Sequence, residues 1–224
     1  KEEIPNSGYD KDYKSIGILF PEDNYIYKVI GTEEGNYGLE IISGKNGEVI
    51  TFTAVDIPIM SAEIHQYAID WDLLLRNKKG VTLQIDADGD GIFDKTVIAD
   101  NELTYDEFIL QTETIIDFDP DVLNLKSEGN FVTVYIELPE GFDLNQIDIS
   151  SIMLNDLVPA LTKPTEIGDY DSDRILDLMV KFERNKVQAI LNPGEKVSIT
   201  ITGRVFHNGN YLDFRGSDII RVIK

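Results

Sequence analysis

The sequence predicts an all-β protein made of two tandem antiparallel β-sandwich domains, with Asp-rich hairpin loops and one or two short helices. Short stretches of alternating apolar and polar residues recur along the 224 residues, as half-buried strands require. Turn signals separate them about every 8 to 12 residues, which favours sandwiches over βαβ units. A hydrophobic content of 42% allows a packed core.

The N-terminal half contains a series of expected strands and two expected helical turns. Glu107 stands three residues after Thr104, which is the spacing of a capping box at the start of a helix. A shorter helical turn is expected between Asp70 and Leu75. The expected strands cover residues 25–31, 37–43, 48–57, 63–69, 81–85 and 95–99.

A new series of strands begins after the predicted helix, so the domain boundary is placed there. The domains are expected to cover residues 1–112 and 113–224. The acidic run at 117–121 is interpreted as a solvated linker, and residues 185–191 as a helical turn ended by Asn192-Pro193-Gly194. The expected strands cover residues 131–138, 147–154, 175–182, 195–206, 211–214 and 218–223.

One acidic loop in each half carries the main functional signal. The first acidic loop, residues 86–94 with the sequence DADGDGIFD, lies between two expected strands and is predicted to close a β-hairpin. Calcium takes six to eight oxygen ligands, which alternating carboxylates supply when the backbone coils around the ion. Gly91 permits the sharp turn, and the apolar side chain of Ile92 is expected to face the core while its carbonyl binds the ion. The expected carboxylate ligands are Asp86, Asp88, Asp90 and Asp94.

The second acidic loop, residues 169–177 with the sequence DYDSDRILD, repeats this spacing. The carbonyl of Ile175 takes the place of the Ile92 carbonyl, but Arg174 stands where the first loop has glycine. A left-handed backbone is costly for arginine, so weaker binding is expected here. The expected carboxylate ligands are Asp169, Asp171, Asp173 and Asp177.

Other interpretations of the two loops are weaker. An EF-hand needs a glutamate at position 12, where the first loop has Val97, and it needs an entering helix where a strand is expected. Magnesium demands small octahedral geometry, and zinc would call for His or Cys, which neither loop has. The remaining alternative is an acidic surface turn without an ion, in which the carboxylates would repel one another.

Composition narrows the class of protein. The chain has 41 acidic and 20 basic residues, a net charge of −21, so nucleic acid and direct membrane insertion are not expected and calcium ions are the expected partners. Cysteine is absent, which excludes disulfides and thiolate chemistry. Two histidines and no nucleophile elbow or phosphate loop predict no catalytic and no cofactor-binding residues, and hence no enzyme. Because the sequence opens at KEEIPNSGYD, the chain is interpreted as a mature form or as an excised piece of something longer.

Two resemblances add to this prediction. The first acidic loop resembles the calcium hairpins of integrin α propeller blades, D-x-D-x-D-G-x-x-D between two strands. The stretches LNLKSEGNFVTVYIELPEGFDLNQIDISSIMLN, PTEIGDYDSDRILDLMVKF and SDIIRVI resemble a module of large secreted or surface proteins of bacteria and archaea. NYIYKVIGTEEGNYGLEI, HQYAIDWD and VTLQIDADGDGIFD resemble the β-sandwich that often precedes it. This resemblance implies an extracellular accessory role.

The expected function is therefore that of a non-catalytic calcium-binding structural or accessory module pair, secreted or at the cell surface. One alternative is a carbohydrate- or cell-surface-binding module, in which Trp71 with Tyr67, or Tyr25 with Tyr27, forms an aromatic platform for a polysaccharide or a surface protein. Ordinary core and cross-strand packing explains the same residues. A second alternative is the accessory region of a secreted hydrolase. His65 is expected half-buried in a strand.

Overall fold

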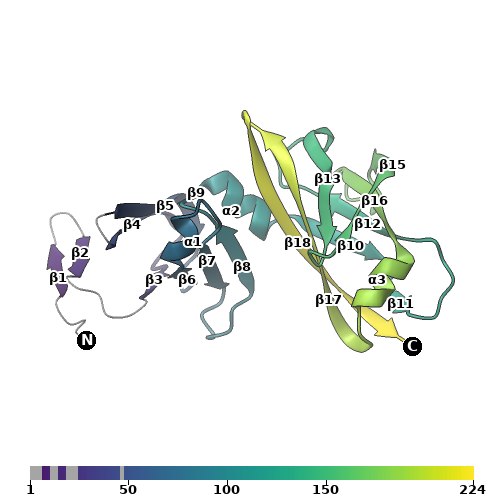
Figure 1. The fold of residues 1–224 in the computed structure, drawn as a ribbon, viewed down its shortest axis with the longest axis horizontal. Coiled ribbons are helices and arrows are strands. Elements are labelled where there is room, and N and C mark those ends of the chain that lie inside the picture. Colours follow the sequence, from purple (N-terminus) through teal and green to yellow (C-terminus); the bar gives the residue numbers. More distant parts are fainter. Residues whose placement is uncertain (1–6, 11–14, 19–24, 46–47) are drawn as a thin grey trace.

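The computed structural model describes residues 7–10, 15–18, 25–45 and 48–224, and in these ranges the protein is mostly β-structure (Figure 1). The all-β prediction is confirmed. The first two strands, β1 (Ser7–Asp10) and β2 (Ser15–Ile18), pair with each other as an antiparallel ribbon. The other strands form four sheets, and their buried side chains fall into two clusters.

The N-terminal cluster of buried residues lies between two sheets and includes Phe52, Tyr67 and Leu83. The first sheet has the order β3-β6-β7-β8, with strands β3 (Ile26–Ile30), β6 (Ile64–Ile69), β7 (Val81–Asp86) and β8 (Lys95–Ala99). The second has the order β4-β5-β9, with strands β4 (Gly35–Lys45), β5 (Glu48–Ile59) and β9 (Glu102–Leu103). Strand β9 pairs with β5 in parallel, whereas the other pairings in these sheets are antiparallel.

The C-terminal cluster of buried residues also lies between two sheets and includes Phe118, Phe182 and Phe214. One sheet has the order β10-β12-β16-β15, with strands β10 (Ile115–Asp119), β12 (Phe131–Glu137), β16 (Asp177–Glu183) and β15 (Leu161–Gly168). The other has the order β11-β18-β17-β13-β14, with strands β11 (Val122–Asn124), β18 (Asn210–Ile223), β17 (Gly194–His207), β13 (Ile147–Leu154) and β14 (Val158–Pro159). Strand β11 pairs with β18 in parallel.

The helices are short, as predicted, but the described residues form three α-helices and a 3-10 turn where one or two short helices were expected. They are α1 (Trp71–Leu74), α2 (Tyr105–Thr112), α3 (Arg184–Ile190) and the 3-10 turn η1 (Leu144–Gln146). The predicted capping box is confirmed, because the Glu107 N–H donates to Thr104 Oγ1 at 3.3 Å and the Thr104 N–H donates to Glu107 Oε2 at 3.0 Å. In the described ranges, no helix combines the length and apolar character needed to cross a membrane.

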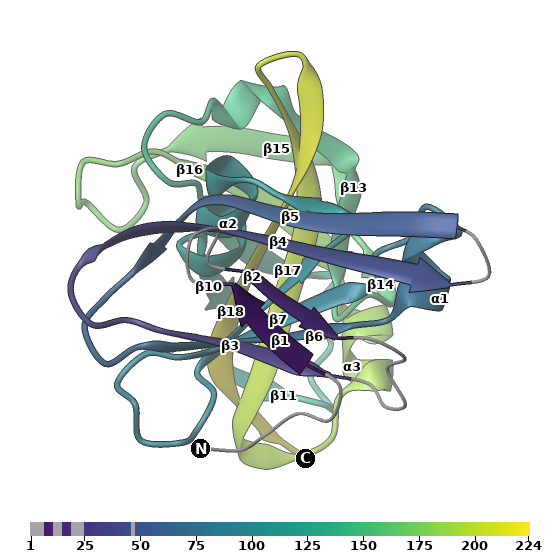
Figure 2. The same ribbon diagram turned by 90° about the vertical axis from the view of Figure 1, so that its left-hand side faces the viewer.

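Helix α2 lies where the two clusters meet. Phe108 and Ile109 belong to the N-terminal cluster, and the next residue, Leu110, belongs to the C-terminal cluster. Figure 2 shows the β4–β5 hairpin at the front and the long β17–β18 hairpin passing behind it. The proposed boundary between residues 112 and 113 falls at the end of this helix and stays a prediction.

Three expectations about strands are corrected. The run at 117–121 is not a linker, because Asp117 and Asp119 lie within β10 and pair with β12. The two last predicted strands are one strand, β18. Strand β15 was not predicted, because its mostly exposed sequence LTKPTEIG contains a proline and lacks apolar alternation; it is an edge strand, where proline is tolerated.

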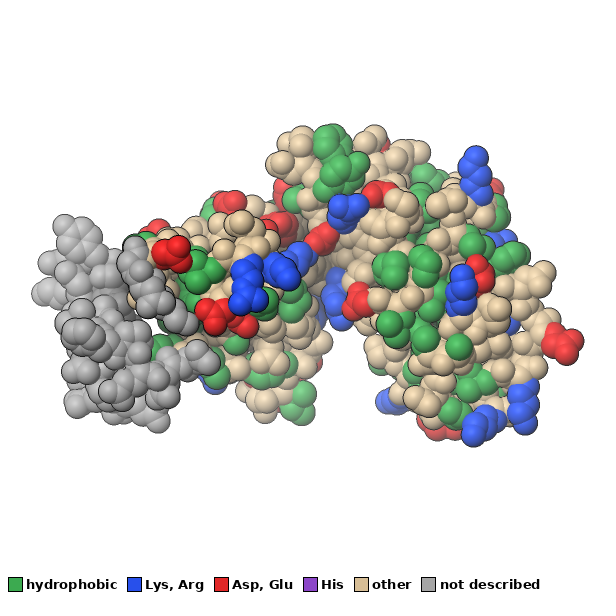
Figure 3. Space-filling model, in the orientation of Figure 1, with side chains coloured by type: hydrophobic (Ala, Val, Ile, Leu, Met, Phe, Trp, Pro, Cys, Tyr) green, Lys and Arg blue, Asp and Glu red, His purple; other side chains and the backbone are tan. Residues whose placement is uncertain are grey.

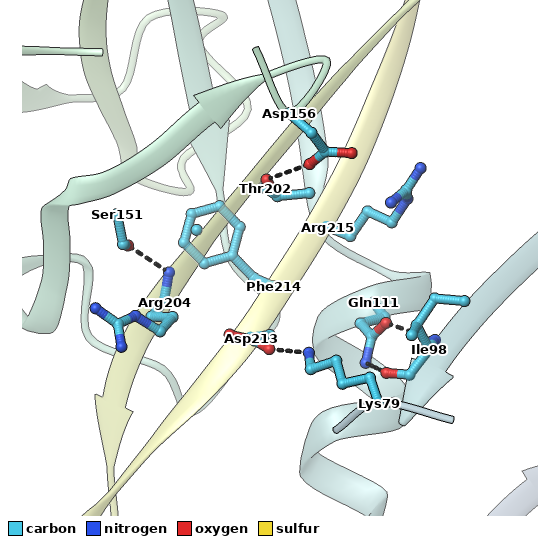
Figure 4. Close-up of a pocket in the computed structure, with 11 residues that line it drawn as sticks. Lys79, Ile98, Gln111, Ser151, Asp156, Thr202, Arg204, Asp213, Phe214 and Arg215 are labelled. Carbon is cyan, nitrogen blue, oxygen red and sulfur yellow. Dashed lines mark hydrogen bonds and ion pairs between the residues drawn. The ribbon is translucent and has the colours of Figure 1, made fainter. Parts of the chain in front are cut away.

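A crevice of about 340 Å³ lies beside α2, between β8 and the β17–β18 hairpin, and Figure 3 shows a hollow with basic side chains near it on this face of the molecule. Its polar groups are largely paired with one another (Figure 4). Lys79 forms an ion pair with Asp213 of β18. The Gln111 amide accepts from the Ile98 N–H at 2.9 Å and donates to the Ile98 carbonyl at 3.1 Å. The Gln111 side chain therefore pairs with the backbone of β8 as a neighbouring strand would, and it joins α2 to that strand.

Candidate metal centres

The first acidic loop closes the hairpin between β7 and β8, as predicted. The last paired residues of the two strands are Ile85 and Lys95, and the Asp94 N–H donates to the Ile85 carbonyl at 2.8 Å across the base of the loop. The nine residues 86–94, between Ile85 and Lys95, coil beyond this hydrogen bond. The chain thus brings its acidic residues together at one end of the sheet.

Asp86 organises this loop from the inside. Its side chain is only 1% exposed, although it is a carboxylate in a highly acidic chain. Its Oδ1 accepts from the N–H groups of Gly89 at 2.7 Å and Asp90 at 3.1 Å, and its Oδ2 accepts from the Gly91 N–H at 2.9 Å. A carboxylate has about four acceptor positions, so roughly one remains for an ion.

The carboxylates of the first acidic loop converge only in part. Oxygens of Asp86, Asp88 and Asp94 lie within 4.8 Å of one another. Two oxygens bound to one calcium at about 2.3–2.6 Å can be no more than about 5 Å apart, so this spacing fits a calcium site. Asp90 lies outside this group, and its Oδ1 accepts from the Ile92 N–H at 2.7 Å. The Ile92 side chain is 67% exposed, so the expectation that it faces the core is wrong.

The second acidic loop connects β15 and β16, which also form an antiparallel hairpin. It repeats three hydrogen bonds of the first loop at the same positions. The Tyr170 N–H donates to Asp177 Oδ2 at 3.0 Å, as the Ala87 N–H does to Asp94 Oδ2 at 2.8 Å. The other two matching pairs are Asp173 N–H to Asp171 Oδ1 with Asp90 N–H to Asp88 Oδ1, and Ile175 N–H to Asp173 Oδ1 with Ile92 N–H to Asp90 Oδ1.

The backbone of the two loops also turns in the same way. Positions 4 and 6 have positive φ in both loops, with values of +75° and +92° at Gly89 and Gly91 and of +69° and +80° at Ser172 and Arg174. Only glycine adopts this region without strain. The left-handed conformation expected of Arg174 is therefore confirmed, and the second loop keeps the coil at a cost that the first avoids.

The second acidic loop receives a carboxylate that the sequence did not reveal. Oxygens of Glu137, Asp171 and Asp173 lie within 4.8 Å of one another, whereas Asp169 and Asp177 are outside that group. Glu137 ends β12, one residue beyond the pair formed by Ile136 and Leu178. Only the pairing of β12 with β16 brings it to the loop. Its position at the end of an alternating strand gave no signal of this register.

The carboxylates of the second site repel one another. The Glu137 side chain is buried, and this burial, with the negative charges of Asp173, Asp177 and Asp171, raises the pKa of Glu137. Burial likewise raises the pKa of Asp177, and the nearby aspartates of the loop add to the rise. A divalent cation among these groups would remove part of the repulsion.

The aromatic and histidine residues do not form the expected platform. Tyr67 and His65 are fully buried, so neither a Trp71–Tyr67 platform nor a half-buried His65 is correct. The Tyr37 hydroxyl hydrogen-bonds His65 Nδ1 at 2.8 Å and also the Tyr67 hydroxyl. Tyr27 packs against the N-terminal cluster. Tyr37, His65 and Tyr67 thus form a hydrogen-bonded group inside the N-terminal part rather than a binding surface.

No family model, no curated protein and no solved structure matches the chain. Both loops offer oxygen ligands alone, which suits a hard cation such as calcium and does not suit zinc or copper.

The residue at position 6 of each acidic loop should affect the stability of the folded protein. We expect Arg174→Gly to raise the free energy of unfolding by about 1 kcal/mol and Gly91→Arg to lower it by a similar amount, because an L-residue is strained in the left-handed region. A Cβ at Gly91 would have no heavy atom within 4 Å, so strain rather than a clash decides the result. Urea denaturation in EDTA measures both changes. Equal stabilities for all three proteins would contradict the strain at Arg174.

Proposed function

We propose that this chain is a non-catalytic pair of tandem β-sandwich domains, each stiffened by calcium at its acidic loop, within a larger secreted or cell-surface protein. One observation carries the proposal: two hairpins in different sheets fold their nine-residue acidic loops with three matching hydrogen bonds and with positive φ at the same two positions. Two unrelated solvated turns would not be expected to share these hydrogen bonds and this backbone conformation.

Calcium, when bound, would supply positive charge at loops that otherwise hold several carboxylates close together. The chain's own residues do the rest. Asp86 and the backbone N–H groups fix the coil of the first acidic loop, and Glu137 completes the second from a neighbouring strand. The net charge of −21 makes self-repulsion a general cost of folding, which cation binding reduces. The proposed role is therefore mechanical, to hold two hairpins and their sheets.

The proposed extracellular location fits the expected affinity. Extracellular calcium modules bind with dissociation constants of about 10⁻⁴–10⁻³ M. An ion that binds only the folded state stabilises it by about 2.7 kcal/mol at a hundredfold excess over its dissociation constant. Two occupied loops of this kind would make folding depend on calcium, as suits a part that is needed only outside the cell.

A calcium titration tests the proposal. We expect calorimetry to count two sites, and thermal unfolding to shift upward with calcium, much less with magnesium and not at all with EDTA. Asp88→Ala should remove most of the stabilisation due to the first acidic loop, because Asp88 is an exposed member of its oxygen group. Glu40→Ala, which removes an exposed carboxylate on β4, is the control with the same change in charge.

The outcomes separate the alternatives. A single site abolished by Asp88→Ala would assign calcium to the first acidic loop and leave the second as an ion-free turn. If millimolar calcium produced no heat of binding and no shift in melting temperature, both loops would be solvated turns and the proposal would fail. An equal loss in Glu40→Ala would reduce the effect to net charge.

A further inference from the structure

The crevice beside α2 brings three basic side chains together. Its wall on the C-terminal side is the outer face of the β17–β18 hairpin. On this face Arg215 of β18 lies opposite Thr202 of β17. Arg204 and Asp213 form the next outward-facing pair toward the tip of the hairpin. With Lys79 on the other side of the crevice, three cations meet here in a chain that has 41 acidic and only 20 basic residues.

Two of these three cations have partners in the fold. Lys79 forms its ion pair with Asp213. Arg204 Nη2 lies 2.9 Å from Asp148 Oδ2, and the guanidinium carbon of Arg204 lies 5.3 Å from the centre of the Tyr211 ring. The charges of Lys79 and Arg204 are therefore balanced without any ligand.

Arg215 is the exception. In the described ranges its guanidinium makes no hydrogen bond and no ion pair, and no dashed line reaches it in Figure 4. The residue is half-buried at the crevice. A guanidinium carries five N–H donors and a permanent positive charge, and such a charge is screened less at a half-buried position than in open solvent. Arg215 is thus a cation that remains available for an anion.

Asp156 supplies acceptors next to this cation. It lies in the turn between β13 and β14, and its Oδ1 accepts from the hydroxyl of Thr202, the register partner of Arg215, at 3.2 Å. The turn is fixed to β17, because the Asn155 N–H donates to the Thr200 carbonyl at 2.8 Å and Asn155 Oδ1 accepts from the Thr200 N–H at 2.8 Å. The acceptors are thus placed before any ligand arrives, which lowers the entropic cost of binding.

These groups define the chemistry of a ligand. A carboxylate matches the guanidinium of Arg215 in geometry and carries one negative charge to its one positive charge. A phosphate ester carries about 1.5 to 2 negative charges at pH 7, and the excess would face the carboxylates of Asp156 and Asp213. Asp156 and Thr202 present oxygens that accept hydrogen bonds from hydroxyl groups. The volume of about 340 Å³ is near the lower end of the range of about 300–1,000 Å³ for small-molecule sites.

We propose that this crevice binds a uronic acid, with its carboxylate on Arg215 and its ring hydroxyls on Asp156 and Thr202. A uronic acid carries one carboxylate and several hydroxyls on one small ring, which is the combination that these three residues can recognise. A free sugar acid and a uronate unit of a polysaccharide share this chemistry. The lining contains no residue of either acidic loop, so the inference does not rest on the proposed calcium function.

Saturation-transfer NMR tests the proposal, because it detects weak ligands. The intact chain, in millimolar calcium and about 0.15 M salt, is mixed with galacturonate, glucuronate and trigalacturonate. Galactose and glucose lack the carboxylate, and acetate lacks the hydroxyls. We expect transfer to at least one uronate and none to these three counterparts. A response to the monomers alone would indicate a free sugar acid, and a response to trigalacturonate as well would indicate a polysaccharide; both support the inference.

Three variants test the assigned residues by titration with the responding uronate. Arg215→Gln should weaken binding at least about tenfold, because it removes the charge that meets the carboxylate. Asp156→Asn keeps a residue that tolerates the positive φ of +57° and should weaken binding several-fold. Arg221→Gln removes the same charge from β18 outside the crevice, where Arg221 pairs with Glu195 at 3.0 Å, and should leave binding unchanged. An unchanged melting curve shows that each variant is folded.

Several results would overturn the inference. They are no transfer to any uronate, equal transfer to acetate or to a neutral sugar, and uronate binding that Arg215→Gln does not weaken. The last result would also reveal uronate held by calcium at an acidic loop instead of by the crevice. A response only to an acidic peptide, probed with acetyl-aspartate amide, would make the crevice a protein-binding site and would equally overturn it. None of these results changes the calcium titration, which is done without sugar.

Discussion

Replacing Asp86 with alanine is expected to lower the free energy of unfolding by about 3 kcal/mol in EDTA, before any calcium is added. The carboxylate is 1% exposed and accepts three backbone N–H groups, from Gly89, Asp90 and Gly91. Alanine would leave the N–H groups of Gly89 and Gly91 without this acceptor, whereas the Asp90 N–H would keep Asp88 Oδ1. A partly buried donor left unpaired costs about 1–3 kcal/mol. Urea denaturation followed by Trp71 emission measures the change.

The matched variant is Asp88→Ala in the same loop. Asp88 is exposed, and its side chain accepts one bond, from the Asp90 N–H at 3.1 Å. We therefore expect Asp88→Ala to leave the stability in EDTA within about 0.5 kcal/mol of the unmodified chain, while both variants lose calcium binding at this loop. If the two variants were equally stable in EDTA, Asp86 would act only as a ligand and not as the organiser of the coil.

Lowering the pH should destabilise the protein through His65. Burial lowers the pKa of this imidazole, and the carboxylate of Glu63, whose Oε1 is 3.2 Å from Nε2, opposes that effect only in part. Below about pH 6.5, the ordinary pKa of histidine, the unfolded chain takes up a proton that the folded chain does not. The stability is thus complete above that pH and is lost as the pH falls, with a slope of up to about 1.4 kcal/mol per pH unit.

Two measurements check this prediction. Since the chain has only two histidines, their imidazole resonances can be followed separately by NMR, and the pKa of His65 should lie below 6.5. The difference in unfolding free energy between the unmodified chain and His65→Asn, followed from pH 8 to pH 5, isolates the histidine from the carboxylates that titrate in both. An imidazole that titrates at or above pH 6.5 would contradict the burial argument.

The features that the sequence predicts well are local. The capping box of α2 depends on Thr104 and Glu107 alone, and strands β8 and β13 begin and end at the predicted residues because alternation and turn residues define both ends. The hairpin at 86–94 follows from two strands with a short acidic stretch between them. Each of these features forms between residues that are close together in the sequence.

The features that the sequence does not reveal depend on register between distant strands. Glu137 reaches the second acidic loop only through the pairing of β12 with β16, and β9 and β11 join their sheets in parallel as short edge strands with little alternation. The burial of Tyr67 and His65 depends on which face of β6 meets the other sheet. No local pattern contains this information, and the ligand sets named from the loops alone stay predictions.

The change from one buried cluster to the other between Ile109 and Leu110 has a practical consequence for dissecting the protein. A fragment cut at residue 112 would carry Leu110 into water without the strands that cover it, and the complementary fragment would lose that side chain from its interior. Helix α2 contributes side chains to both buried clusters, so a cut at its end exposes part of each. A truncation series that keeps α2 on both fragments, by duplicating residues 104–113, is therefore the better route to isolated halves.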